Sequence, residues 1–111
     1  HILDTALGVP AAGVRLTLYR IAGDERALIC EGVTNADGRT EAPLLAAEAF
    51  ETGVYELVFH TGAYFDATGI APEAPRFPDV IPIRFGISNA GAHYHVPLLL
   101  SPFGFSTYRG S

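Results

Sequence analysis

Residues 14–20 have the sequence Val-Arg-Leu-Thr-Leu-Tyr-Arg, in which apolar and polar side chains alternate. Because successive side chains of a β-strand point to opposite faces of a sheet, this pattern predicts a strand with one buried and one exposed face. Gly23 and Asp24 follow as a turn signal, so residues 27–33 are expected to pair back as the next strand. The pattern therefore places an antiparallel hairpin at the start of the core.

Further strand-like segments lie on both sides of this hairpin in the sequence. Further strands are expected at residues 1–4, 54–59, 83–87 and 93–100, and the tail 103–111 alternates aromatic with small residues. Asp37-Gly38 is a strong tight-turn dipeptide, and the four prolines of residues 72–82 predict a loop or an edge strand. Seven or so short strands with frequent turn signals predict an antiparallel β-sandwich.

Two segments could form short helices. Leu44–Glu51 contains good helix formers, and Ala63–Thr68 has room for one or two turns. Neither is long enough to organise a core.

Length and composition restrict the class of protein. The 111 residues form a single domain, and 17% charged residues against 49% apolar ones argue against disorder and suggest that partner subunits cover part of the surface. All seven basic residues are Arg and the formal net charge is −5, which does not favour nucleic-acid binding through a basic face.

Cys30 is the only cysteine, so no intrachain disulfide and no cysteine zinc site can form. No apolar stretch has the length of a membrane helix, and a cytoplasmic location is expected.

Histidines are the first candidates for chemistry. If residues 93–100 form a strand, His93 and His95 share one face of it, and the plainest interpretation is a pair of surface histidines. A metal site would need a third ligand, which His1 or His60 could supply only through the fold. General acid–base catalysis is the remaining possibility, because histidine titrates near neutral pH.

The other local signals are weaker. Arg39 follows the Asp-Gly turn and is either a solvated charge or a planar fork for substrate oxygens. Ser101, Ser106 and Ser111 lack the Gly-x-Ser-x-Gly context of a nucleophilic serine, and no glycine-rich phosphate loop is present.

Three blocks taken together resemble one family. Residues 1–11 (His-Ile-Leu-Asp-Thr-Ala-Leu-Gly-Val-Pro-Ala), residues 34–39 (Thr-Asn-Ala-Asp-Gly-Arg) and residues 93–111, which end in Tyr-Arg-Gly-Ser, occur in the order found in 5-hydroxyisourate hydrolases. That family is also called the transthyretin-related proteins. The resemblance spans the whole chain, and the terminal tetrapeptide is highly specific.

The resemblance implies a reaction and a fold. Family members hydrolyse 5-hydroxyisourate, the product of urate oxidase, to 2-oxo-4-hydroxy-4-carboxy-5-ureidoimidazoline in purine degradation, with no metal or other cofactor. The implied fold is all-β: a transthyretin-like (prealbumin) antiparallel β-sandwich of about eight strands in two sheets, with one short helix near residues 63–68 rather than 44–51. The implied assembly is a homotetramer with its sites at the dimer–dimer interface, and no nucleic acid or membrane partner is expected.

The resemblance also assigns roles to single residues. The family's catalytic positions match His1, Arg39, His95 and Ser111. We expect the substrate to be bound by Arg39, Pro97, Leu98, Tyr108 and Ser111. We expect His1 and His95 to activate water and return a proton, Arg39 to hold and polarise substrate oxygens, and Ser111 to position water or a histidine. Pro97 and Leu98 are expected to form an apolar wall.

Two alternatives remain open at this point. A transthyretin-type carrier would share the fold, but it has Lys, Glu and Thr at the positions of His1, Arg39 and His95 and lacks the Tyr-Arg-Gly-Ser ending. A zinc hydrolase would use His1, His93 and His95 as ligands.

Overall fold

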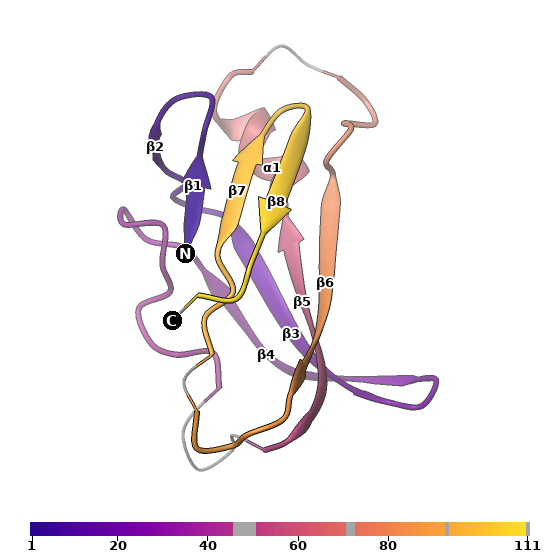
Figure 1. Ribbon diagram of the computed structural model, residues 1–111. Coiled ribbons are helices and arrows are strands. Elements are labelled where there is room, and N and C mark those ends of the chain that lie inside the picture. Colours follow the sequence, from indigo (N-terminus) through magenta and orange to yellow (C-terminus); the bar gives the residue numbers. More distant parts are fainter. Residues whose placement is uncertain (46–50, 71–72, 93, 111) are drawn as a thin grey trace.

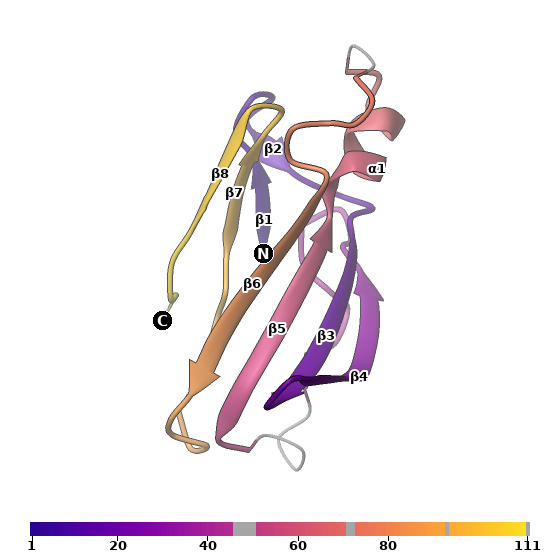
Figure 2. The ribbon, with the colours of Figure 1, turned by 90° about the vertical axis from the view of Figure 1, so that its right-hand side faces the viewer.

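The computed structural model describes residues 1–45, 51–70, 73–92 and 94–110. In this part of the chain, two four-stranded sheets pack face to face, and helix α1 (Thr61–Ala67) lies at one end of the sandwich (Figures 1 and 2). The β1 sheet has the order β2-β1-β7-β8, with bounds Val9–Pro10, Ile2–Asp4, Leu98–Ser101 and Gly104–Thr107. The β3 sheet has the order β4-β3-β5-β6, with bounds Glu25–Val33, Arg15–Ala22, Gly53–His60 and Val80–Ile87.

The β3 sheet contains the hairpin that the alternating sequence predicts. Strands β3 and β4 pair antiparallel around the turn at Gly23 and Asp24, and β5 and β6 extend the sheet antiparallel on the other side of β3. Pro82 lies within β6, which is an edge strand, so the proline-rich segment ends as an edge as expected. Leu16 and Leu18 are buried as the alternation predicts; Thr17 is buried too, because β3 is a central strand flanked by neighbours.

The β1 sheet departs from a purely antiparallel arrangement. Strands β1 and β7 run parallel, with Ile2 opposite Leu98 and Asp4 opposite Leu100. Sequence patterns identify strands but not the direction in which distant strands pair. Parallel neighbours need a long connection, and here the chain between β1 and β7 forms the other sheet. The parallel register brings the start of the chain beside the residues that precede β7.

The strand expected at residues 93–100 is shorter than predicted. Strand β7 begins at Leu98, and of the preceding described residues His95 forms only an isolated bridge, to Gly110. Pro97 carries no N–H for a ladder, which explains why regular pairing starts after it. His93 lies outside the described residues, so its position relative to His95 stays a prediction.

Helix α1 forms where the family resemblance implies, near residues 63–68. Residues 46–50 of the other candidate helix lie outside the described residues. The first turn of α1 is tied to the segment before β6, since the Thr61 hydroxyl donates to the carbonyl of Pro78 at 2.7 Å. None of the helices in the described ranges has the length and apolar character that a membrane crossing requires.

The core lies between the two sheets and below α1. Its largest fully buried apolar side chains come from β1, β5, β7 and the helix: Ile2, Tyr55, Phe59, Phe65, Leu98 and Leu100. Burial of side chains of this size contributes about 1.5–3 kcal/mol each relative to exposure. The core therefore fixes β1 and β7, the two strands next to the candidate site.

Candidate functional site

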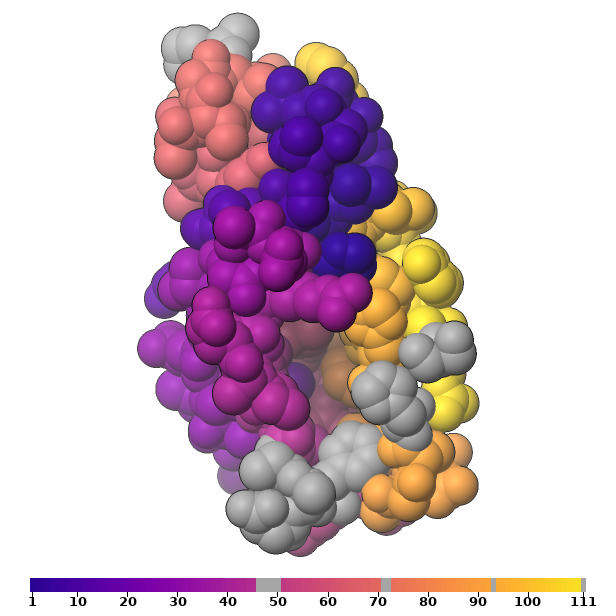
Figure 3. All heavy atoms as spheres, turned by 90° about the vertical axis from the view of Figure 1, so that its left-hand side faces the viewer, coloured from indigo at the N-terminus to yellow at the C-terminus, as the bar shows by residue number. Residues whose placement is uncertain are grey.

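A pocket of about 610 Å³ opens between the two sheets. Figure 3 shows the molecule hollowed between the segment after the Asp-Gly turn and the segment leading into β7. The pocket has a polar mouth and an apolar interior. Its described lining residues are His1, Leu16, Leu18, Thr34, Arg39, Thr40, Glu41, Ala42, Pro43, Leu44, Leu45, Tyr55, Leu57, Phe59, Phe85, Ile87, Tyr94, His95 and Val96.

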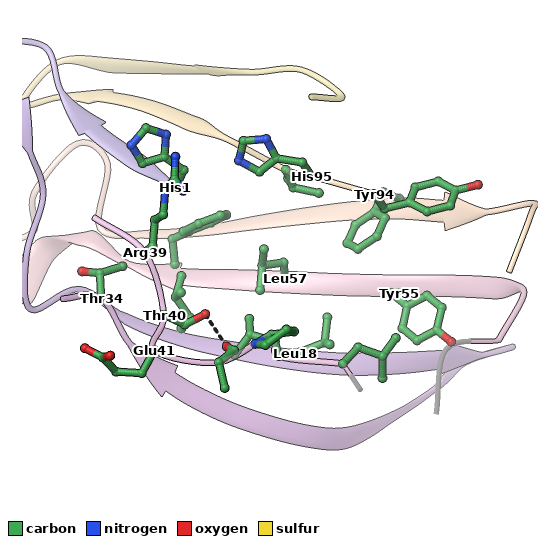
Figure 4. Close-up of a pocket in the computed structure, with 18 of the residues that line it drawn as sticks. His1, Leu18, Thr34, Arg39, Thr40, Glu41, Tyr55, Leu57, Tyr94 and His95 are labelled. Carbon is green, nitrogen blue, oxygen red and sulfur yellow. Dashed lines mark hydrogen bonds between the residues drawn. The ribbon is translucent and has the colours of Figure 1, made fainter. Parts of the chain in front are cut away.

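Three of the residues predicted from the sequence meet at the mouth. The rings of His1 and His95 are nearly parallel, with an interplanar angle of 23° and centroids 6.2 Å apart. Figure 4 shows both imidazoles on the same side of the pocket, with Arg39 beside His1. These residues are separated by 38 and 56 positions in the sequence (39 − 1 and 95 − 39), so only the fold brings them together.

Backbone hydrogen bonds hold these residues in place. The carbonyl of His1 accepts a hydrogen bond from the N–H of Leu98 at 2.9 Å, and the N–H of Ile2 donates to the carbonyl of Gly38 at 2.9 Å. Strand β1 thus connects β7 on one side to the turn before Arg39 on the other. The side chain of Asn35 closes that turn, because its Oδ1 accepts from the N–H of Arg39 at 3.2 Å.

Gly38 is required for this connection. Its φ is +73°, in the left-handed region that side chains disfavour, and a Cβ there would lie 2.5 Å from the carbonyl oxygen of Ile2. The Asp-Gly dipeptide therefore serves both the turn and the close approach of β1. The sequence predicts the turn but not this contact.

The mouth carries positive charge. Arg39 is exposed, and its guanidinium makes no hydrogen bond or ion pair with the described residues. Figure 4 shows Arg39 beside His1 at this mouth. The guanidinium is thus close to His1 and available to oxygen atoms of a ligand.

The C-terminal segment contacts His95 and its neighbour Tyr94. The N–H of Gly110 donates to its carbonyl at 2.8 Å, and the neighbouring Tyr94 lies under the guanidinium of Arg109, with Cζ 4.2 Å from the ring centroid. The hydroxyl of Tyr94 accepts hydrogen bonds from the N–H groups of Ser88 and Asn89 at 3.0 and 3.1 Å. The hydrogen bond to the Ser88 side chain, with those backbone bonds and the charge of Arg109, lowers the pKa of Tyr94.

The remaining predicted site residues lie elsewhere. Leu98 is fully buried in the core, so its expected role as an apolar wall of the site disagrees with its position. Pro97 is buried and does not line the pocket. Tyr108 is exposed and lines a second, smaller cavity of about 300 Å³ beside β6. Ser111 lies outside the described residues.

Sequence reasoning missed several lining residues. Thr34, Thr40 and Glu41 flank the Asp-Gly-Arg turn and line the pocket, and Glu41 accepts a hydrogen bond from Asn35 at 3.2 Å. Their closeness in sequence to Arg39 is the signal that could have found them. No group of three His, Cys, Asp or Glu side chains suited to a metal ion occurs among the described residues, which do not include His93.

A family model, a sequence relative and a solved structure each match this chain over all or nearly all of its length. The model of the HIUase/Transthyretin family matches residues 1–110. The "5-hydroxyisourate hydrolase 2" of Rhizobium meliloti (strain 1021) is 57% identical over 111 residues, which cover all of this chain and 92% of the relative. The crystal structure of (S)-allantoin synthase superposes with a TM-score of 0.93 at 48% identity, covering all of this chain but only 42% of that protein.

The structure of transthyretin from Sparus aurata has the same fold. It superposes with a TM-score of 0.87 at 35% identity, over 98% of this chain and 91% of that one. The transthyretin-like β-sandwich expected from the sequence motifs is confirmed. With a family match over almost the whole chain and a relative more than half identical to it, this chain belongs to the HIUase/transthyretin family.

Proposed function

We propose that the chain hydrolyses 5-hydroxyisourate by attack of water on the cyclic amide, with His1 and His95 as acid–base groups and Arg39 as the substrate clamp. The observation that carries the proposal is the meeting of these three side chains at the mouth of one pocket. The Rhizobium meliloti relative, which is named 5-hydroxyisourate hydrolase 2 and is 57% identical over the whole chain, supports the choice of substrate.

Hydrolysis of an amide by water requires two proton transfers. A base must take a proton from the attacking water, and the departing ring nitrogen must receive one. Imidazole has an ordinary pKa of about 6.5 and can do either at neutral pH. With the two rings 6.2 Å apart, one histidine accepts the water proton while a C–O bond forms. The C–N bond then breaks, and an imidazolium returns a proton to the nitrogen.

Charge develops on the carbonyl oxygen during this attack. Arg39 offers a planar set of N–H donors that can hold this oxygen and orient the substrate ring. The apolar residues below the mouth, among them Leu57 and Phe59, exclude water from that side and strengthen the interaction. Ser111 is included in the proposal through its place in the terminal tetrapeptide, as the group that positions water or a histidine.

The test follows the absorbance decay of freshly generated 5-hydroxyisourate in the presence of single variants. His1→Asn and His95→Asn should each lower kcat/KM about 10²- to 10⁴-fold, the range for loss of a general acid or base. Arg39→Lys should raise KM, because the charge stays but the fork is lost. His60→Gln is the matched control, since His60 ends β5 and does not line the pocket.

Two outcomes would count against the proposal. If the wild-type protein does not accelerate the decay above a protein-free sample, the assigned reaction is wrong. If folded His95→Asn keeps the wild-type rate, the assigned role of His95 is wrong. Loss of activity on exhaustive chelation, with recovery on adding zinc, would instead support the zinc alternative.

The proposal includes a homotetramer with its sites at the dimer–dimer interface. Apolar side chains exposed on and beside the β1 sheet support a covered surface: Leu7, Val9, Phe103, Phe105 and Tyr108. Sedimentation should give four copies at assay concentration, and Phe105→Asp should dissociate them. A fully active monomer would contradict this part of the proposal.

A further inference from the structure

Gly110 contacts His95 through its backbone. The two residues form an isolated antiparallel bridge, in which the N–H of Gly110 donates to the carbonyl of His95 at 2.8 Å. This bridge lies beyond the end of β8 and before the start of β7, where the described ladder between the two strands does not reach. It holds the C-terminal segment against the residue proposed to exchange protons.

The imidazole of His95 occupies the space where a side chain of residue 110 would lie. A Cβ built on Gly110 would be 2.9 Å from Cγ and 3.1 Å from Cβ of His95, and would overlap Nδ1. Gly110 is not among the glycines with positive φ, so the backbone there could accept any residue. Glycine is needed at this position for space, not for conformation.

A second contact supports the same segment. The guanidinium of Arg109 stacks on the ring of Tyr94, with Cζ 4.2 Å from its centroid. The hydroxyl of Tyr94 is fixed in turn by the N–H groups of Ser88 and Asn89. Residues 94 and 95 therefore meet residues 109 and 110 in two adjacent contacts, one between side chains and one involving the glycine.

We propose that Gly110, assisted by the Arg109–Tyr94 stack, is a positioning residue that sets the orientation of the His95 imidazole relative to His1. The inference rests on the proposed function, in which His95 transfers protons. It assigns a role to two members of the terminal Tyr-Arg-Gly-Ser that do not line the main pocket. A side chain at position 110 must displace the imidazole, and a displacement of about 1 Å can lower a rate 10²-fold.

The first test compares two glycine variants. Gly110→Ala should lower kcat for 5-hydroxyisourate roughly 10- to 100-fold with KM within about 2-fold, because Arg39 still binds substrate. Gly104→Ala is the matched control: Gly104 lies on β8, its φ is not positive, and a Cβ there meets nothing within 4 Å. It should keep both constants within about 2-fold.

A second readout follows the ring of His95 directly. In protein labelled with ¹⁵N-histidine, the ring signals of His95 are assigned by their loss in His95→Asn. Gly110→Ala should shift these signals and their pH titration, whereas Gly104→Ala should leave them unchanged. Arg109→Gln, which removes the charge above Tyr94, should shift the His95 ring signals in the same direction as Gly110→Ala does. Arg109→Lys keeps that charge and should shift them less.

The outcomes separate this inference from the proposed function. Wild-type kcat and unchanged His95 signals in Gly110→Ala would overturn the inference and leave the hydrolase intact. A wild-type protein without activity, but with His95 signals that move in Gly110→Ala, would overturn the function and retain the positioning role. If Gly110→Ala does not fold, Arg109→Gln decides, and an unchanged His95 titration in it overturns the inference.

Discussion

The phenol hydroxyl of Tyr64 donates a 2.7 Å hydrogen bond to Oδ2 of Asp4 and so joins helix α1 to the end of strand β1. Asp4 is 1% exposed, and its other oxygen accepts from the N–H groups of Ala6 and Leu7 at 3.0 and 3.1 Å. Burial, and then the hydrogen bond and charge of Asp4, raise the pKa of Tyr64 well above its ordinary value. The hydroxyl therefore stays a donor, and strand β1, which directly follows His1, is fixed at its far end.

Replacing Tyr64 by Phe should lower the free energy of unfolding by about 1–3 kcal/mol, because a buried carboxylate oxygen loses its donor. Urea unfolding measures this change. Tyr19→Phe is the control, because the Tyr19 hydroxyl makes no hydrogen bond with the described residues while its ring stacks under Arg26. Equal losses in both variants would mean that the buried hydrogen bond contributes nothing specific.

Glu56 lies between two arginines on the outer face of the β3 sheet. Its carboxylate is nearly buried, and it accepts from Arg26 at 2.9 Å and from Arg84 at 3.1 Å. We expect Arg26→Met or Arg84→Met alone to cost about 1 kcal/mol or less, because the other cation remains. The double variant should cost about 3–5 kcal/mol, since it leaves the carboxylate without a cation. A double-mutant cycle by urea unfolding measures the excess.

The exposed ion pair of Arg15 and Glu31 is the control for this double-mutant cycle. These residues lie 3.6 Å apart at their charged atoms, and both side chains are more than half exposed. Replacing either or both should change the free energy of unfolding by about 0.5 kcal/mol or less, additively. An additive result for Arg26 and Arg84 as well would show that water already compensates for Glu56.

The sequence predicts the strands better than it predicts their partners. The β3–β4 hairpin follows from alternation and from Gly23-Asp24, because both signals are local. The parallel pairing of β1 with β7 depends on which strands the long connection brings together, and no local pattern encodes that. The late start of β7 at Leu98 follows from Pro97, although the apolar pattern alone predicted a strand from residue 93.

The same limit applies to the site. From local patterns, Arg39 was as consistent with a solvated turn as with a substrate clamp, and His95 with a surface histidine. Motif resemblance singled them out, and the fold brings both beside His1. Resemblance did not predict that Leu98 faces the core, because a shared motif identifies a position in the chain but not the face of the sheet to which its side chain points. The contact of Gly110 with His95 was also invisible in the sequence, since it consists of a missing side chain.

His60 should make stability depend on pH. Its ring lies 3.4 Å from Arg15 Nη2 and 3.4 Å from Thr17 Oγ1. Burial and then the charge of Arg15 lower its pKa, against the opposing charges of Glu31 and Asp79. The unfolded chain therefore binds a proton at higher pH than the folded one. Stability should fall as the pH drops through about 6.5, and the fall should end below the lowered pKa of the folded state.

The His60→Gln variant tests this dependence. Urea unfolding between pH 8 and pH 5 should give a smaller decrease than in wild type, by less than the ~1.4 kcal/mol per pH unit of one whole proton. Arg15→Gln should reduce the decrease in part, because it removes the repulsion but not the burial. An identical slope in His60→Gln and wild type would assign the pH dependence to other groups.

Alanine substitutions at Gly38 and Gly8 distinguish the effect of backbone strain from the effect of a steric contact. Both have positive φ, +73° and +71°, so an alanine at either should cost about 1–2 kcal/mol of stability. A Cβ at Gly8 meets nothing within 4 Å, whereas one at Gly38 lies 2.5 Å from the carbonyl oxygen of Ile2. Gly38→Ala should therefore cost more and should also move Arg39 away from His1. We expect 5-hydroxyisourate hydrolysis to fall about 10-fold or more in Gly38→Ala and to stay near wild type in Gly8→Ala. Equal activity in the two variants would mean that the spacing between β1 and the turn does not control the site.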